Sequence, residues 1–264
     1  MSLANQIAAH LPYLRRYARA LTGSQNAGDA FVRAMLEAAM ADTALMGALE
    51  GGRVPLYRAF TKVWESAQSD NVFAGDSTSE HEAGAQHRLG TITPPARQAL
   101  LLTTLEDFTI PEAAAILERD VPEVEALVAE AVAGIDREQK TSVLIIEDEP
   151  LIAMQLEDLV GGLGHKICGT AATRTQAREV VTEAMPGLVL ADIQLADGSS
   201  GLDAVDDILS LGSVPVIFIT AYPERLLTGD RPEPTYLVTK PFQEATVRAA
   251  ISQALFFRSS KPLG

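Results

Sequence analysis

Five short strand-like segments that alternate with helix-type segments constrain the second half of this chain most strongly. Four of them, at 143–146, 188–191, 214–219 and 236–239, are apolar runs typical of strands buried on both faces, and a weaker strand pattern lies at 166–169. The intervening and final segments have amphipathic helical spacing, at 151–163, 173–184, 202–209 and 243–257. This alternation predicts an α/β doubly wound domain with a five-stranded parallel sheet of the flavodoxin-like order. We place the domain at residues 142–264.

The first half lacks such runs, and its apolar residues recur at helical spacing. One helix face is marked by residues that step by three or four, namely Ile7, Leu11, Leu14, Ala18 and Leu21. We therefore predict an all-α domain at residues 1–138. The chain as a whole is expected to be a two-domain protein, because 264 residues exceed the usual size of one domain.

The all-α part is expected to consist of two helical lobes. A stretch rich in Ser, Gly, Asp and Glu at 66–90 predicts a connector between a first lobe at 1–65 and a second lobe at 91–138. After a helix near 95–104, the second lobe has helices at 111–117 and 122–136 around a short turn. This pattern is typical of a helix-turn-helix.

Polar residues follow four of the five predicted strands. The first strand is followed by Glu147, Asp148 and Glu149, the third by Asp192, the fourth by Thr220 and the fifth by Lys240. Parallel sheets place their chemistry at the carboxyl ends of the strands. We therefore expect these side chains to share one crevice.

Such a crevice predicts phosphoryl chemistry with a divalent cation. Clustered carboxylates repel one another, and an oxygen-rich ligand set suits Mg²⁺ together with phosphate oxygens. Lys240 would supply a positive charge and Thr220 a hydroxyl donor for a phosphoryl group. Asp192 is then the candidate nucleophile, which would form an aspartyl phosphate.

These residues identify residues 142–257 as similar to the receiver domain of two-component response regulators. The resemblance lies in the segments Ile146-Glu147-Asp148-Glu149-Pro150, Ala191-Asp192-Ile193-Gln194, Ile219-Thr220-Ala221 and Thr239-Lys240-Pro241. It implies phosphorylation of Asp192 by a sensor histidine kinase or a phosphotransferase. It also implies a Mg²⁺ site made by Glu147, Asp148, Asp192 and the backbone carbonyl of Gln194, with Thr220 and Lys240 contacting the phosphoryl group. The chain departs from the family at Leu237, where an aromatic switch residue is usual.

Charge argues against DNA binding by the helix-turn-helix. The chain has 21 basic and 35 acidic residues, a formal net charge of −14. Residues 120–136, where a recognition helix would lie, contain no Lys or Arg and five acidic residues. A groove-binding helix needs cations against the phosphates, so this helix is expected to bind no DNA directly.

The remaining composition predicts a cytoplasmic, monomeric protein. The single cysteine, Cys168, excludes an intramolecular disulfide. No uncharged apolar run approaches the length needed to span a membrane, and the N-terminus has no signal-peptide pattern.

The helical half resembles sigma factors of the extracytoplasmic-function type, at 10–21, 55–64, 89–102 and 110–117. A sigma-like domain followed by a receiver resembles the PhyR-type general stress response regulators. This resemblance implies an anti-anti-sigma factor that is not an enzyme. Phosphorylation at Asp192 would free the sigma-like domain to bind a small NepR-type anti-sigma factor, and the true sigma factor would be released.

Two alternatives stay open at this point. The first is a DNA-binding response regulator, a transcription factor with a helix-turn-helix output, which the charge of residues 120–136 disfavours. The second is a phosphatase with an Asp nucleophile. Such enzymes have a second Asp two residues after the nucleophile, where this chain has Gln194.

Overall fold

The computed structural model describes residues 3–71, 95–135, 139–195, 198, 200–223, 226 and 234–259. The chain folds into two compact units, residues 1–131 and 132–264, and the division between them falls within helix α8 (Val121–Ile135). None of the helices in the described ranges is long and apolar enough to cross a membrane.

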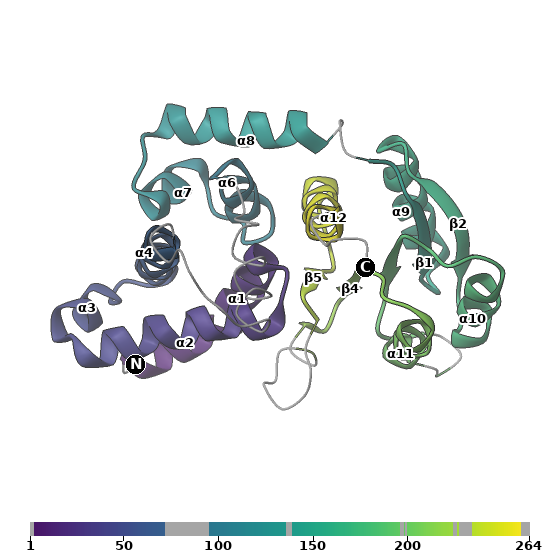
Figure 1. Cartoon of the computed structure of the whole chain (residues 1–264), viewed down its shortest axis with the longest axis horizontal. Coiled ribbons are helices and arrows are strands. Elements are labelled where there is room, and N and C mark those ends of the chain that lie inside the picture. Colours follow the sequence, from purple (N-terminus) through teal and green to yellow (C-terminus); the bar gives the residue numbers. More distant parts are fainter. Residues whose placement is uncertain are drawn as a thin grey trace. The chain divides into compact units, whose positions relative to one another are not determined.

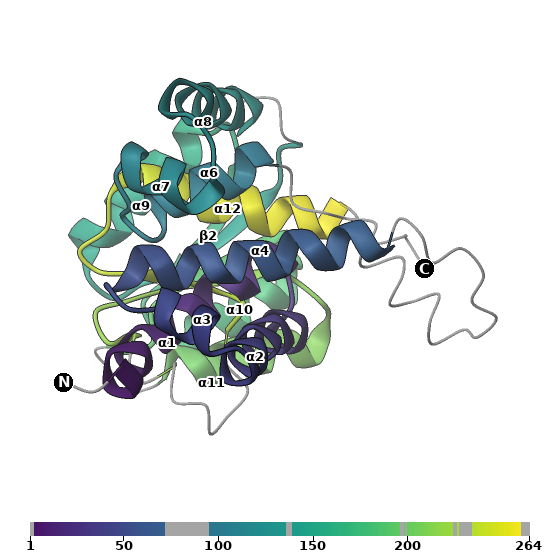
Figure 2. The ribbon, with the colours of Figure 1, turned by 90° about the vertical axis from the view of Figure 1, so that its left-hand side faces the viewer.

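The first unit is all-α, as predicted. It contains α1 (Leu3–Thr22), α2 (Gln25–Ala41), α3 (Thr43–Ala48), α4 (Arg53–Asn71), α6 (Pro95–Thr104), α7 (Ile110–Leu117) and most of α8. Figures 1 and 2 show α4 lying between α7 and α2, and α4 contacts both helices. Helix α3 was not predicted, because its six residues have too little periodicity to stand out.

Local side-chain bonds set the helix boundaries in this unit. Gly23 adopts a positive φ of 64° at the end of α1, and Ser24 caps α2 by accepting a hydrogen bond from the Ala27 N–H. Thr109 and Glu112 form a reciprocal capping box at the start of α7. The left-handed residue Glu118 ends α7 and begins the predicted turn to α8.

The structure corrects one detail of the predicted connector. Helix α4 continues to Asn71, so the first six residues of the expected connector at 66–90 are helical. The rest of that predicted segment lies outside the described residues.

The second unit has the predicted doubly wound fold. Its strands are β1 (Ser142–Ile146), β2 (Lys166–Ala171), β3 (Leu188–Ala191), β4 (Val216–Thr220) and β5 (Tyr236–Thr239). They form one parallel sheet in the order β2-β1-β3-β4-β5, which confirms the flavodoxin-like prediction. Every residue of β3 is buried, which explains its unbroken apolar sequence.

Helices cover both faces of this sheet. Helices α10 (Arg174–Glu183) and α11 (Gly201–Leu211) contact each other and close the core over one face, and α9 (Pro150–Gly162) and α12 (Glu244–Ser259) lie on the other (Figure 1). This arrangement leaves the carboxyl ends of β1, β3, β4 and β5 at one edge of the unit, where the polar residues follow.

Candidate functional site

The sheet itself brings the predicted site residues together. Hydrogen bonding continues one residue beyond the strands: the Asp192 N–H donates to the Ile146 carbonyl at 2.8 Å, and the Lys240 N–H donates to the Thr220 carbonyl at 2.8 Å. The Glu147 N–H donates to the Ala171 carbonyl at 2.9 Å. Backbone hydrogen bonds to neighbouring strands therefore fix the main chain of Glu147, Asp192 and Lys240, independently of their side-chain contacts.

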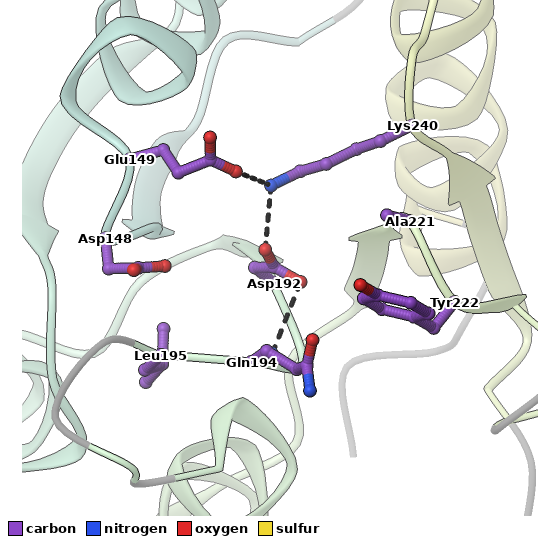
Figure 3. Close-up of a pocket in the computed structure, with 8 residues that line it drawn as sticks. All are labelled: Asp148, Glu149, Asp192, Gln194, Leu195, Ala221, Tyr222 and Lys240. Carbon is purple, nitrogen blue, oxygen red and sulfur yellow. Dashed lines mark hydrogen bonds and ion pairs between the residues drawn. The ribbon is translucent and has the colours of Figure 1, made fainter.

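Lys240 is the hub of the site. Its Nζ lies 2.7 Å from Asp192 Oδ2, 2.8 Å from Glu147 Oε2 and 3.4 Å from Glu149 Oε1 (Figure 3 draws the contacts with Asp192 and Glu149). Partial burial works against the charged ammonium, but the bonds to Asp192 and Glu147 outweigh it and raise the pKa of Lys240. The lysine is therefore held as a cation among three carboxylates.

Three carboxylates form a group that could hold a metal ion. Ligand oxygens of Glu147, Asp148 and Asp192 lie within 4.8 Å of one another. Burial raises the pKa of Glu147, although Lys240 partly opposes this effect. The buried Glu147 Oε2 is paired with Lys240 Nζ at 2.8 Å. A cluster of carboxylates that offers only oxygen donors fits a hard divalent cation.

The carboxylate of Asp192 is held by hydrogen bonds and also lines a cavity. Its Oδ1 accepts hydrogen bonds from the backbone N–H groups of Ile193 and Gln194, the latter at 3.4 Å, and its Oδ2 accepts from Lys240. The residue also lines a cavity of about 420 Å³ together with Asp148, Glu149, Gln194, Leu195, Ala221, Tyr222 and Lys240 (Figure 3). A small ligand entering this cavity would meet a positioned carboxylate.

Gly201 packs closely against the backbone of Asp192. A Cβ atom at position 201 would lie 1.7 Å from the Asp192 carbonyl oxygen, and the Gly201 N–H donates to the Ile193 carbonyl at 2.8 Å. Only a residue without a side chain permits the start of α11 to pack this tightly against the end of β3.

The predicted residues thus take three kinds of position. Glu147, Asp148, Asp192 and Lys240 are in one cluster. Thr220 is fully buried and does not line the cavity, and its Oγ1 accepts a hydrogen bond from the Tyr222 N–H at 3.2 Å. Leu237 is a core residue, 1% exposed.

Two residues at the site were not among the predicted ligands or phosphoryl-contacting residues. Glu149 is at the N-cap position of α9, where its side chain makes no capping bond and instead reaches Lys240. Tyr222 lines the cavity and is 42% exposed. The rule of polar residues at strand ends indicated Glu149, but nothing in the sequence separates this residue from an ordinary helix cap. The rule did not indicate Tyr222, which lies two residues beyond the end of β4.

The helix-turn-helix of the first unit has an acidic second helix. In α8, Glu123, Glu125 and Glu130 are exposed, and Arg119 in the preceding turn forms an ion pair with Glu123. Val121, the first residue of α8, is 38% exposed. The buried line of the helix runs through Val124, Ala131 and Ile135 and leaves its first residue to one side.

Comparison with known proteins accounts for both parts of the chain. Family models match in the order Sigma2 domain of PhyR at residues 7–61, sigma-like domain of the response regulator PhyR at 89–138 and response regulator receiver domain at 143–252. The phyllosphere-induced regulator PhyR of Methylorubrum extorquens is 55% identical over 265 residues, covering 98% of this chain and 97% of that protein. The chain belongs to the PhyR family of response regulators.

Solved structures of PhyR proteins are similar over nearly the whole chain. The anti-anti-sigma factor PhyR from Bartonella quintana is 49% identical, with a TM-score of 0.84 over 98% of this chain and 97% of that one. A co-crystal structure of the Bartonella quintana PhyR complexed with the anti-sigma factor NepR is 49% identical over 97% of this chain and 100% of that one, with a TM-score of 0.41. PhyR-family membership confirms the predicted pairing of a sigma-like part with a receiver.

Proposed function

We propose that this chain is a phosphorylation-dependent anti-anti-sigma factor, in which phosphorylation of Asp192 allows the sigma-like part to bind a NepR-type anti-sigma factor. The observation that carries the proposal is the cluster at the sheet edge, in which Lys240 Nζ lies 2.7 Å from Asp192 beside two further carboxylates. Such a switch acts on transcription in the cytoplasm and turns over no substrate. We place the boundary between its two functional parts at residues 138–142.

The acidic cluster supports a role for Mg²⁺. Glu147, Asp148 and Asp192, with the backbone carbonyl of Gln194, would hold the ion. When bound, Mg²⁺ would supply positive charge against the phosphoryl oxygens. Lys240 would supply a second positive charge, and the buried Thr220 would supply a hydroxyl donor to the phosphoryl group.

The transfer step uses Asp192 as the nucleophile. A carboxylate oxygen attacks the phosphorus of a phosphohistidine, a P–O bond forms as the P–N bond breaks, and the imidazole leaves with the electron pair and gains a proton. The backbone N–H groups of Ile193 and Gln194 hold the other carboxylate oxygen of Asp192. Lys240 is already within reach of the incoming oxygens.

Partner binding then follows from a shift between two states. Phosphorylation adds about 1.5 to 2 negative charges at one point, and moving an equilibrium from 1:99 to 99:1 requires about 5.5 kcal/mol. Contacts of the phosphoryl group with Lys240 and the metal would supply one part, and binding of the anti-sigma factor to the open state the other. The relatives support this partner, since the Bartonella quintana PhyR is named an anti-anti-sigma factor and is solved with NepR.

The test compares binding of a NepR-type anti-sigma factor with and without acetyl phosphate and Mg²⁺. We expect tight binding only for donor-treated wild type, and weak binding for Asp192→Ala under both conditions. Equal affinity in all four samples would refute the switch. Promoter DNA is the control ligand, because sequence-specific binding at low salt would favour a transcription factor instead.

A further inference from the structure

The backbone of Gln194, which we place among the metal ligands, is held by residues outside the acidic cluster. Gln194 forms an isolated antiparallel pair with Ser200, the residue just before α11. Beside this pair, the Gly201 N–H donates a hydrogen bond to the Ile193 carbonyl at 2.8 Å. The chain that leaves β3 is therefore tied to the start of α11 directly after Asp192.

This pairing leaves the main chain of Gln194 directed toward the site. In an antiparallel ladder, a residue pair with the hydrogen bonds on its flanks turns its own N–H and C=O groups away from the partner strand. The Gln194 N–H accordingly donates to Asp192 Oδ1 at 3.4 Å, a bond that Figure 3 draws. None of the hydrogen bonds found among the described residues ends on the Gln194 carbonyl. This carbonyl is therefore available to a cation beside the carboxylates.

Ser200 holds its own end of the pair by capping α11. Its backbone is extended, at φ −99° and ψ 132°, and its Oγ accepts a hydrogen bond from the Leu202 N–H at 3.1 Å. The Ser200 carbonyl accepts a further bond from the Ala204 N–H at 3.1 Å. A cap hydroxyl of this kind stabilises the first turn of a helix. The same hydroxyl thereby fixes the residue that pairs with Gln194.

The body of α11 is a firm support for this first turn. Buried residues such as Val205 and Ile208 lie in the core of the second unit. Asp207 also accepts two hydrogen bonds from Arg174 of α10, at 2.7 and 2.8 Å. Because the body of the helix is held in this way, the position of its first turn depends mainly on the cap.

We propose that Ser200 is a positioning residue of the metal site, whose capping bond and pairing with Gln194 hold the Gln194 carbonyl in place as a ligand for Mg²⁺. Mg²⁺ demands a near-ideal octahedral arrangement, so it needs a carbonyl that does not move. Ca²⁺ accepts more oxygens in a flexible arrangement and depends less on one fixed ligand. The inference rests on the metal site of the proposed function, and it gives Ser200 a part in selecting the ion.

The neighbouring helix offers a matched control. Thr173 caps α10 in the same way, since its side chain accepts a hydrogen bond from the Gln176 N–H at 3.2 Å. Thr173 does not line the cavity. Ser200→Ala and Thr173→Ala therefore each remove one cap hydroxyl from a helix on the same face of the sheet, but only the first is next to a metal ligand. Ser200→Thr keeps the hydroxyl and is the conservative variant.

Isothermal titration calorimetry of the full chain, with Mg²⁺ and with Ca²⁺, measures the two affinities separately. We expect the Mg²⁺ affinity to fall about tenfold in Ser200→Ala and to be unchanged in Thr173→Ala. The Ca²⁺ affinity of Ser200→Ala should fall by less than about twofold. Ser200→Thr should bind Mg²⁺ as wild type does. If Ser200→Ala does not fold, Ser200→Gly takes its place, because glycine is well tolerated at a helix cap and also lacks the hydroxyl.

Amide hydrogen exchange of the full chain, followed by NMR, reports the pairing itself. The Gly201 N–H should exchange faster in Ser200→Ala than in wild type. In Thr173→Ala the faster amide should instead be that of Ala177, which donates to the Thr173 carbonyl at 3.0 Å. Mg²⁺ should slow the exchange of the Gly201 N–H in wild type, because metal binding and pairing stabilise each other reciprocally.

Several results would overturn the role of Ser200. Unchanged Mg²⁺ affinity in Ser200→Ala, or an equal loss in Thr173→Ala, would do so. An equal loss of Mg²⁺ and Ca²⁺ affinity would also do so, because it would show that the carboxylates and not the carbonyl had been disturbed. A wild type that binds no Mg²⁺ would refute the metal site of the proposed function and this inference with it. If Mg²⁺ binds as expected but phosphorylation changes no partner affinity, the switch fails and the role of Ser200 stands.

Discussion

Lys240 and Asp192 are joined across an intervening strand. The lysine follows β5 and the aspartate follows β3, with β4 between them, yet Lys240 Nζ lies 2.7 Å from Asp192 Oδ2. The long side chain of Lys240 bridges the end of β4, where Thr220 is held by its carbonyl bond to the Lys240 N–H. Any change in the charge of Asp192 therefore acts directly on the ends of both β4 and β5.

Removing the ammonium group of Lys240 is expected to strengthen metal binding. In Lys240→Met, Glu147 and Asp192 lose a cation that occupies the oxygens a metal would use, so affinity for Mg²⁺ should rise about tenfold. Isothermal titration calorimetry measures the affinity. Lys166→Met, at an exposed position at the start of β2, is the control and should leave it unchanged. Weaker Mg²⁺ binding in Lys240→Met would contradict the assigned ligands.

Glu149→Gln is expected to speed phosphorylation by a small anionic donor. Glu149 is 64% exposed in its side chain, faces the cavity and contacts Lys240 at 3.4 Å, so its charge both repels the donor and competes for the ammonium. The rate with acetyl phosphate should rise about two- to fivefold at low ionic strength, and the gain should disappear near about 0.5 M salt. Glu179→Gln, an exposed acid on α10, should show no gain.

Gly201→Ala is expected to disrupt the site without changing any polar side chain. The added methyl group would lie 1.7 Å from the Asp192 carbonyl oxygen, which forces α11 away from β3. Overpacking of this kind should cost about 3 kcal/mol and lower the calorimetric unfolding midpoint of the second unit by about 10 °C. Gly161→Ala in α9, where a Cβ has nothing within 4 Å, should be neutral or slightly stabilising. Equal stability of the two variants would show that the Gly201 packing is not needed.

The stabilisation that Asp29 gives to the first unit should be lost at low pH. It accepts hydrogen bonds from Arg15 and Arg19, whose charges outweigh partial burial and lower its pKa. Because the folded-state pKa is below the unfolded value, the stabilisation is complete above about pH 5 and is lost as pH falls through the folded pKa. Asp29→Asn should cost about 1 kcal/mol at pH 7, since the group is partly exposed.

Trp64 fluorescence during denaturant unfolding measures this difference, because the single tryptophan lies in the first unit. The difference between wild type and Asp29→Asn should shrink as pH is lowered from 5 towards 3. A difference that stays constant down to pH 3 would assign the effect to shape rather than charge.

The sequence predicted those features that follow from a repeated pattern. Apolar runs located β1, β3, β4 and β5, while β2 was marked only by a weak pattern that begins at Lys166. The rule that chemistry lies at the carboxyl ends of strands selected Glu147, Asp148, Asp192 and Lys240. The sequence could not predict contacts that depend on the conformation of a single side chain. Glu149 has the position of a helix cap but bonds Lys240, which is 91 residues away in the chain. No sequence pattern distinguishes Glu106 from other acidic residues. Its buried ion pair is with Arg16, which lies 90 residues earlier in the chain.

The acidic character of α8 has a consequence for how this chain diversifies. A helix that contacts bases has to stay matched to many promoters at once, and most changes on its exposed side are harmful. Residues 120–136 contain no Lys or Arg, so under the proposed function their exposed acids are not matched to any set of promoters. The exposed side of α8 is then free to change as long as its buried line through Val124 and Ala131 is kept. Most single substitutions on that side should alter the stability of the first unit by less than about 0.5 kcal/mol.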